Sequence, residues 1–420
     1  MRNFTFKGLF LTAVFMLLGC FSIQAANDDL ITKQITIKLD EAGTLPDKIE
    51  TNKKYKITNL KIIGEINGTD LRMIREMAGH NFNGNSTDGK LSVLDLSEAK
   101  IVKGGDCYYN DNCSNYYTYN NVIGSYAFKG CSGLTSLTLP AGITWIDSYA
   151  FKGCSGLTSL TLPDGITEIG YYAFEGCSGL TSLNLPDGIT LIRSCAFCGC
   201  SGLTSLNLPA SITSIGTGAF IDCSGLTSLT LPAGITSIGE STFGGCSGLT
   251  SLNLPDGITE IGSYAFQDCS GLTSLTLPDG ITSIGKSAFR GCSGLTSLNL
   301  PAGITEIGSY AFRGCSGLTS IYVYAEKVPK IGWDVFVGVD ANKCTVYVPK
   351  GTYDDYISSD FRYFWDIVEF DATGIDKTTT STDAKEVSRY SVNGQRLVDP
   401  TKGLNIVKYS DGSVKKVAVE

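Results

Sequence analysis

The sequence predicts a long solenoid, mainly β with short helical turns, in which one unit of 23 residues is stacked many times. Three observations support this fold class. Cysteine recurs every 23 residues through the middle of the 420-residue chain. Each interval carries the segment Leu-x-x-Leu-x-Leu, and almost every interval ends with an Ala-Phe pair. A fixed period in this range indicates coils that bury their apolar faces against their neighbours. The repeating cysteines are Cys131, Cys154, Cys177, Cys200, Cys223, Cys246, Cys269, Cys292 and Cys315.

The unit Cys154–Gly176 illustrates how one coil is expected to fold. Its leucines alternate with Ser159 and Thr161, which predicts a short strand with the leucines inward and the polar residues outward. Pro163-Asp164-Gly165 follows as a turn. Ile166–Ile169 forms a second extended segment, and Phe174 returns apolar bulk to the core before the next cysteine.

Leu-x-x-Leu-x-Leu at a period in the twenties is typical of a leucine-rich repeat. We therefore predict a leucine-rich repeat solenoid with an α/β N-terminal capping domain, a short helical C-terminal cap and a small β tail. The expected segments are a signal peptide at 1–25, the N-terminal capping domain at 26–121, the repeat array at 122–342, the C-terminal cap at 343–370, a linker at 371–387 and the tail at 388–420.

The capping domain is expected to contain strands, a helix and a long loop. Residues 33–39 and 55–63 alternate apolar and polar side chains as half-buried strands do, and Gly64 is expected to end the second. Residues 71–78 have one apolar helical face, with Thr69 or Asp70 as the N-cap. Residues 104–121 are rich in Tyr, Asn, Asp and Gly and are predicted to form an exposed loop.

The C-terminal region is expected to close the array. Residues 344–349 alternate as a last strand, and residues 352–367 are expected to form a helical cap whose aromatic side chains cover the final coil. Beyond the polar linker, residues 403–409 and 414–419 predict a small hairpin joined by Ser410-Asp411-Gly412-Ser413.

The first residues predict export. Arg2 and Lys7 form a basic start, and residues 8–18 supply an apolar segment that is typical of a signal peptide. Two processing routes fit: ordinary cleavage after Ala25 or Ala26, or a lipobox that would place a lipid anchor on Cys20. No later apolar run is long enough to span a bilayer.

Charge and cysteine content limit the classes of function. The formal net charge is -8, and the repeats carry twelve acidic and five basic side chains, which argues against nucleic acid as a partner. The recurring cysteines predict a column of buried thiols, with pairing between neighbouring coils as the alternative. Cys107 and Cys113 are candidates for one disulfide, and Cys195 and Cys198 for another or for two free thiols.

These residues resemble a known family. Leu157–Pro163, Ile166–Gly170 and Ala173–Cys177 are similar to the BspA-like leucine-rich repeat, and the likeness extends over about residues 123–369. The resemblance implies a bacterial protein at the cell surface or outer membrane, or a secreted one, that mediates adhesion to host matrix or to other cells. It implies no catalytic residue. Residues 393–396, 402–407 and 416–419 also resemble the sorting tail of type IX secretion.

Candidate binding residues fall into two groups. One is an exposed lattice of small polar residues on the strands, represented by Ser159, Thr161, Ser182, Asn184, Ser205 and Asn207. The other consists of aromatic residues, namely Trp145, Tyr126, Tyr149, Tyr172, Tyr264 and Tyr310. Aromatic residues anchor protein interfaces. The lattice lacks such anchors and is explained by default as a solvated surface; the alternative is a docking face for a periodic ligand, such as a glycan chain or an extended protein strand. The tyrosines are equally well explained as rings lying across the edge of the coils.

An enzyme is not expected, and neither is a cofactor. His80 is the one histidine of the chain, and no nucleophile with its base, phosphate loop or set of zinc ligands can be assembled around it. The sequence therefore predicts a non-catalytic, exported surface protein that binds an extracellular protein. A glycan-binding module and a structural spacer are the alternatives.

Overall fold

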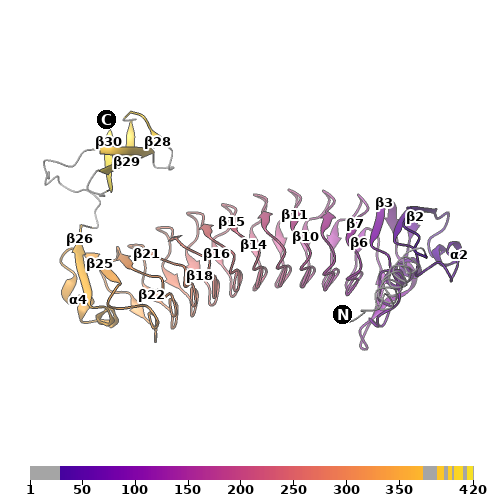
Figure 1. The fold of residues 1–420 in the computed structure, drawn as a ribbon, viewed down its shortest axis with the longest axis horizontal. Coiled ribbons are helices and arrows are strands. Elements are labelled where there is room, and N and C mark those ends of the chain that lie inside the picture. Colours follow the sequence, from indigo (N-terminus) through magenta and orange to yellow (C-terminus); the bar gives the residue numbers. More distant parts are fainter. Residues whose placement is uncertain (1–28, 372–385, 392–395, 400–401, 410–413, 420) are drawn as a thin grey trace, which may run out of the picture.

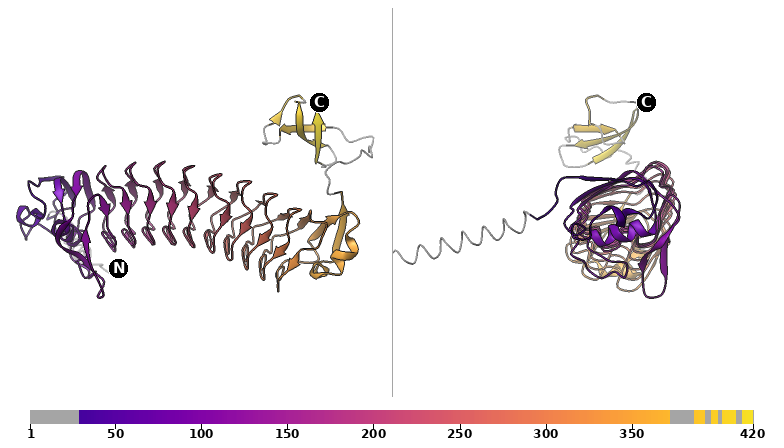
Figure 2. Two further views of the ribbon diagram at one scale, coloured as in Figure 1. Left: turned by 180° about the vertical axis from the view of Figure 1, so that it is seen from behind. Right: turned by 90° about the vertical axis from the view of Figure 1, so that its right-hand side faces the viewer.

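The predicted solenoid is confirmed. The computed structural model describes residues 29–371, 386–391, 396–399, 402–409 and 414–419. The coils stack into a long, gently curved rod (Figure 1), and the view along the rod shows them nearly superposed (Figure 2). The expected signal peptide, Cys20 and most of the expected linker lie outside the described residues.

Each coil of the array contributes one strand to each of two faces of the rod. The strands of the first face are β7 (Ser136–Thr138), β9 (Ser159–Thr161), β11 (Ser182–Asn184), β13 (Ser205–Asn207), β15 (Ser228–Thr230), β17 (Ser251–Asn253), β19 (Leu275–Thr276), β21 (Ser297–Leu300) and β23 (Ser320–Val323). The second face holds β6 (Val122–Ile123), β8 (Trp145–Ile146), β10 (Glu168–Ile169), β12 (Leu191–Ile192), β14 (Ser214–Ile215), β16 (Ser237–Ile238), β18 (Glu260–Ile261), β20 (Ser283–Ile284), β22 (Glu306–Ile307) and β24 (Lys330–Ile331). Pairing within each face is parallel and in register, so equivalent residues form columns.

Columns of identical side chains fill the interior. The phenylalanines from Phe128 to Phe336 stack with ring centroids 5.1 to 5.9 Å apart. Beside them run the recurring cysteines, which are buried free thiols and not disulfides. Each thiol from Cys154 to Cys315 donates to the carbonyl of a phenylalanine, as Cys154 Sγ does to Phe128 O at 3.0 Å. The cysteine therefore fills a small apolar space and gives a second hydrogen bond to a buried carbonyl that already accepts from a backbone N–H group.

A one-directional hydrogen-bond ladder joins the turns that contain these phenylalanines. In each coil three N–H groups donate to carbonyls of the following coil: those of the residue two before the phenylalanine, of the phenylalanine itself and of the residue two after it. In the first coil Tyr126 N donates to Ser148 O at 3.1 Å, Phe128 N to Ala150 O at 2.7 Å and Gly130 N to Lys152 O at 2.7 Å. Because donors face one way, the first coil has three spare carbonyls and the last coil has three spare N–H groups.

The N-terminal cap satisfies the spare carbonyls of the first coil with side chains. Tyr108 Oη donates to Ser125 O at 2.8 Å, Arg75 Nη1 to Ala127 O at 3.0 Å and Arg75 Nη2 to Lys129 O at 3.2 Å. Arg75 and Tyr108 are both fully buried. Two side chains thus occupy the place of the N–H groups that a preceding coil would supply.

The cap itself differs from expectation in three details. It consists of β1 (Ile35–Lys38), α2 (Leu45–Lys48), β2 (Asn59–Ile66), α3 (Gly68–Met77), β3 (Val93–Ile101), β4 (Gly104–Asn110) and β5 (Asn115–Thr118), and its parallel sheet β1-β2-β3 continues into β7 and β9. Gly64 does not end β2; its φ is 106°, and a Cβ there would lie 2.3 Å from Leu39 O. The N-cap of α3 is Asn67, which accepts from Thr69 N at 3.0 Å, while Asp70 accepts from Asn67 N at 2.8 Å. The third difference is the predicted loop at 104–121, which is the antiparallel hairpin β4–β5.

The C-terminal cap is less helical than predicted. It comprises β25 (Thr345–Pro349), α4 (Tyr353–Ile357), the 3-10 helix η1 (Asp360–Tyr363) and β26 (Asp366–Phe370). The strand at 344–349 is therefore not the last, because β26 pairs with β25 and extends the first face by one more strand. In the tail, β27 (Glu386–Ser391), β28 (Arg396–Leu397), β29 (Gly403–Tyr409) and β30 (Val414–Val419) form an antiparallel sheet that includes the predicted hairpin.

Candidate interaction surfaces

The polar lattice lies on the first face of the rod. Ser159 and Thr161 are exposed on either side of the buried Leu160, and the same pattern recurs along the array. Pairing places Ser182 beside Ser205 and their asparagine neighbours beside each other. Within the described residues, the side chains of the six lattice residues form no hydrogen bond to the protein. The lattice therefore offers donors and acceptors, but no large side chain rises from it.

A second set of threonines is already occupied. Thr158 Oγ1 donates to Thr135 O at 3.0 Å, and the equivalent bond recurs in the coils from Thr204 to Thr319. These hydroxyls bind the carbonyl of the preceding coil, 23 residues earlier. They stabilise the stacking of coils, and their hydroxyl hydrogens are therefore not free to donate to a ligand, in contrast to the lattice.

The tyrosines divide into a stack and two isolated rings. Tyr126, Tyr149 and Tyr172 are half-buried and lie nearly parallel, with centroids 4.8 and 4.9 Å apart. The backbone of all three is left-handed, with φ near 60°, as it is at Tyr264 and Tyr310. Tyr264 and Tyr310 are isolated because the equivalent residue of each adjacent coil is not a tyrosine. The stacked rings cover one another's faces, apart from the outer face of Tyr172 at the end of the stack, and the stack stabilises the coils.

The N-terminal hairpin continues this stack. Tyr109 on β4 stacks on Tyr126 at 4.9 Å, and Tyr116 on β5 meets Tyr126 edge-on at 4.7 Å. The side chain of Lys129 lies against the rings of Tyr109 and Tyr126. The tyrosines of the predicted loop thus serve chiefly as a cap, although Tyr117 and Tyr119 remain exposed.

Trp145 belongs to a compact exposed patch on the second face. Its side chain, 41% exposed, stands on β8 next to the position of Glu168 on β10. Glu168 forms an ion pair with Arg193, and the Arg193 guanidinium lies 5.0 Å from the Tyr171 ring and donates to its hydroxyl at 3.1 Å. We call Trp145, Glu168, Tyr171, Leu191 and Arg193 the side patch.

Of the side patch, only Trp145 was predicted from the sequence. The others were detectable as departures from the repeat: Arg193 stands where most coils have Gly, and Leu191 where most have Ser or Glu. Tyr171 stands where most coils have Ser. Stacking at 23-residue intervals brings these departures together. Tryptophan, tyrosine and arginine are the side chains that most often anchor protein interfaces.

The local cysteines are free thiols. Cys107 Sγ lies 2.9 Å from Tyr109 O, and Cys113 is exposed, so the expected bridge between them is not formed in the structure. Cys195 and Cys198 are also unpaired, and burial together with the nearby Cys195 raises the pKa of Cys198 to about 11. Among the described residues, no three His, Cys, Asp or Glu side chains are grouped to hold a metal ion.

His80 packs at the junction of the cap and the first coil. Its ring lies against Gly130, where an added Cβ would be 3.1 Å from it, and its Nδ1 is buried without a partner in the described chain. Burial, and then the charge of Arg75, lowers the pKa of His80. A neutral imidazole wedged against backbone has a structural role here.

Known proteins similar to this chain are repeat proteins. A family model described as BspA type leucine rich repeat region matches residues 121–250 and 218–343. A leucine-rich repeat protein of Bacteroides ovatus is 26% identical, with 60% of this chain and 82% of that chain covered and a TM-score of 0.35. The leucine-rich repeat protein of T. pallidum is 32% identical over 42% of this chain and 72% of that one, with a TM-score of 0.35.

A third similar structure is a leucine-rich cell surface protein of Faecalibacterium prausnitzii. It is 24% identical, with 81% of this chain and 91% of that chain covered and a TM-score of 0.38. No curated protein matches the chain.

Proposed function

We propose that this chain, which belongs to the BspA-type leucine-rich repeat family, is a non-catalytic surface protein that binds an extracellular protein partner. One observation carries the proposal: the side patch gathers an exposed Trp, a Tyr and an Arg at positions where most other coils have Ser or Glu, Ser, and Gly, respectively. Such side chains supply most of the energy at protein interfaces. The rod supplies a rigid support for the patch.

The repeat itself provides a matched experiment. Trp145→Ser, Leu191→Ser and Arg193→Gly each install the residue that other coils carry at that position. The coil should therefore fold unchanged. Glu260→Ser makes an equivalent change on β18, outside the side patch, and serves as the control.

The measurement is saturable binding of the full chain to a panel of purified matrix proteins and polysaccharides. We expect the chain to bind a protein, with affinity reduced about tenfold or more by the triple substitution and unaltered by the control. Equal binding by the triple variant would contradict the role of the side patch.

A glycan ligand is the second candidate function. It is favoured by the lattice, whose hydroxyl and amide groups are exposed and without hydrogen-bond partners in the described chain. In the same panel it predicts binding to polysaccharide alone, unaffected by the side-patch substitutions. Failure to bind any member of the panel would favour a structural spacer instead.

Export to the bacterial surface, or secretion, is part of the proposal. It rests on the signal-like residues 1–25, on the tail resembling a sorting domain and on the family. No helix within the described residues is long and apolar enough to cross a membrane. Incorporation of labelled fatty acid that is lost in Cys20→Ala would identify a lipid anchor, and a mature chain starting at Ala26 or Asn27 would identify ordinary cleavage.

A further inference from the structure

The two ends of the array are closed differently. At the N-terminal end, side chains of Arg75 and Tyr108 bind the three spare carbonyls of the first coil. The last complete turn at the other end contains Phe336, and its ladder donors are the N–H groups of Asp334, Phe336 and Gly338. They are equivalent to the donors of the preceding coil, where Tyr310 N donates to Trp333 O at 2.8 Å, Phe312 N to Val335 O at 3.1 Å and Gly314 N to Val337 O at 2.8 Å.

No group in the described chain accepts from these last three donors. The N–H groups of Asp334, Phe336 and Gly338 form no hydrogen bond, although Phe336 is only 4% exposed. Asp334 and Gly338 are exposed, so water can bind their N–H groups in the free chain, whereas Phe336 is buried and an unpaired N–H there costs free energy. Since the ladder has one direction, all three N–H groups face the side on which another coil would lie.

The neighbouring strand is open on the same side. On the first face, β25 and β26 continue the sheet past the array, but on the second face β24 is the terminal strand. The C-terminal cap therefore adds strands to the first face only. The second face and the turn that contains Phe336 have no following coil to pair with. An open strand edge is a template for an added strand.

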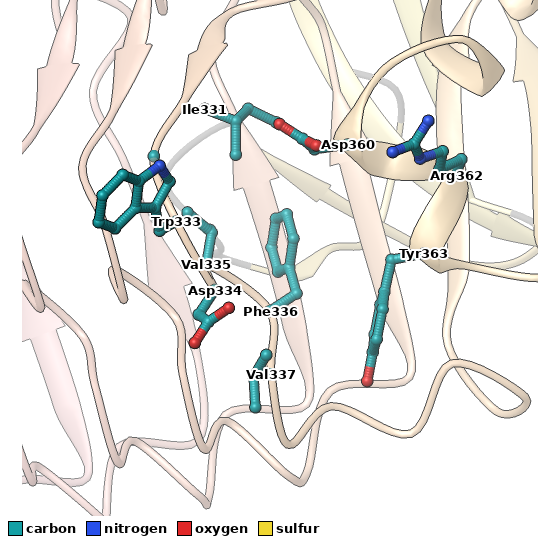
Figure 3. A pocket seen from close by; sticks show the side chains of 10 residues that line it. Ile331, Trp333, Asp334, Val335, Phe336, Val337, Asp360, Arg362 and Tyr363 are labelled. Atoms are coloured by element: carbon teal, nitrogen blue, oxygen red, sulfur yellow. The ribbon is translucent and has the colours of Figure 1, made fainter.

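A pocket of about 410 Å³ occupies the missing position. It lies between residues 331–337 and η1 of the cap (Figure 3). Phe336 forms its apolar floor, packed edge-on against Phe364 at 5.2 Å. Trp333, 80% exposed, and Tyr363 stand on opposite sides in Figure 3. The volume is within the range of sites that bind ligands.

The charges of the pocket are nearly balanced. Asp334 is held by Arg313, whose Nη1 lies 3.3 Å from its Oδ2. Asp360 and Arg362 line the rim, and neither side chain is paired within the described residues. A strongly charged ligand is thus not favoured over a neutral one.

We propose that this end of the rod binds an extended peptide segment of a partner protein, which completes the missing coil. Backbone carbonyls of the peptide accept from the N–H groups of Asp334, Phe336 and Gly338, as carbonyls do in every earlier coil, and an apolar side chain enters between Trp333 and Tyr363. The inference deepens the proposed protein-binding function by adding a second, end-on site with its own partner chemistry.

The first test is hydrogen exchange in the free, full-length chain. The backbone of residues 334–338 should exchange at least about tenfold faster than residues 310–314 of the preceding coil, because only the latter donate to another coil. Equally slow exchange would mean that the donors are already satisfied by the chain itself, and would overturn the proposal.

The second test uses octapeptides, acetylated and amidated at their ends, selected from a random library on the full chain. The selected peptide should slow exchange at residues 334–338. It should lose about tenfold or more in affinity for Trp333→Ala and Val337→Asp. Trp365→Ala is the control, since Trp365 is 82% exposed on the same cap but outside the pocket.

Each alternative has its own result. The proposal would be overturned if the affinity of the selected peptides did not change in Trp333→Ala and Val337→Asp, or if the peptides left hydrogen exchange at residues 334–338 unchanged. Binding of polysaccharide but of no peptide at this pocket would also overturn it. Peptide affinity that rises when residues 372–420 are removed would show that the chain fills its own site, which also overturns it. Peptide binding that survives Trp145→Ser separates this site from the side patch, so either proposal can fail alone.

Discussion

Arg75 Nη1 donates to Ala127 O at 3.0 Å, across a sequence separation of 52 residues. The interaction links the helix of the N-terminal cap to the first coil at the point where the ladder begins. A buried guanidinium is costly unless its donors are bound; here Nη1 and Nη2 donate to backbone carbonyls and the Tyr109 ring lies 4.8 Å away, while Nε has no partner in the described chain. The backbone carbonyls of the first coil thus stabilise the buried guanidinium, and the guanidinium supplies the donors that these carbonyls would otherwise lack.

Replacing Arg75 should open the first coil. Arg75→Met removes the donors to Ala127 and Lys129 and leaves both carbonyls without partners, at a cost of about 2–3 kcal/mol. Hydrogen exchange at residues 150–153, in the coil that follows, should change little, whereas residues 126–131 should exchange about 30- to 150-fold faster. Lys100→Met, which breaks an exposed ion pair with Glu65, should have almost no effect. Uniform destabilisation of the rod would contradict this account.

A cavity in the phenylalanine column should divide the rod. Phe220 is fully buried between Phe197 and Phe243, at centroid distances of 5.3 and 5.5 Å. Phe220→Ala should destabilise the central coils by about 3–5 kcal/mol. Because each coil contacts only its neighbours, the two halves should then unfold in separate transitions in urea, followed by circular dichroism. Thr230→Asn, which installs a residue that other coils carry, is the control and should leave a single unfolding transition. A single transition for Phe220→Ala as well would show that the array unfolds as one cooperative unit and would contradict this prediction.

Thiol chemistry should distinguish the two classes of cysteine. Burial raises the pKa of the column thiols, to about 12 at Cys177 and Cys246, so they lack both access and thiolate. Native alkylation at pH 8 should modify, among the described cysteines, Cys107, Cys113 and Cys195, and Cys198 much more slowly because its pKa is raised to about 11. Peptide mass spectrometry identifies the sites, and unfolding in urea should expose the rest. Modification of a column cysteine in the native chain would contradict the packing described above.

Acid should weaken the junction between cap and array. Burial and the charge of Arg75 lower the pKa of His80 in the folded chain, so the unfolded chain, with a pKa near 6.5, binds more protons below that pH. Stability is therefore complete above about pH 6.5 and falls as the pH drops through this value toward the folded pKa. The chain has one histidine, so one imidazole signal reports the titration by NMR. His80→Gln should flatten the pH dependence of exchange at residues 126–131; a folded pKa at or above 6.5 would disprove the mechanism.

Much of the fold could be predicted because its information is local and repeated. Leu160, Phe174 and Cys177 occupy positions that recur at every coil, and a column of buried residues needs only that period. The hairpin β4–β5 could not be predicted in this way. Its polar composition is typical of a loop, and Tyr108 and Tyr109 are buried only because the first coil lies against them. The same applies to β26, which exists as a strand because β25 is there to pair with it.

The sequence by itself determined the period, the inward and outward positions of each coil and the uniform polar lattice, since these follow from spacing alone. The tertiary structure decided which departures from the repeat become neighbours. It joined Arg193 to Glu168 and Tyr171 beside the strand that carries Trp145, placed Arg75 on the open carbonyls of the first coil and left the N–H groups of the last coil without acceptors. The physical reason is that a one-directional ladder has unequal ends, and only the folded caps fix how each end is completed.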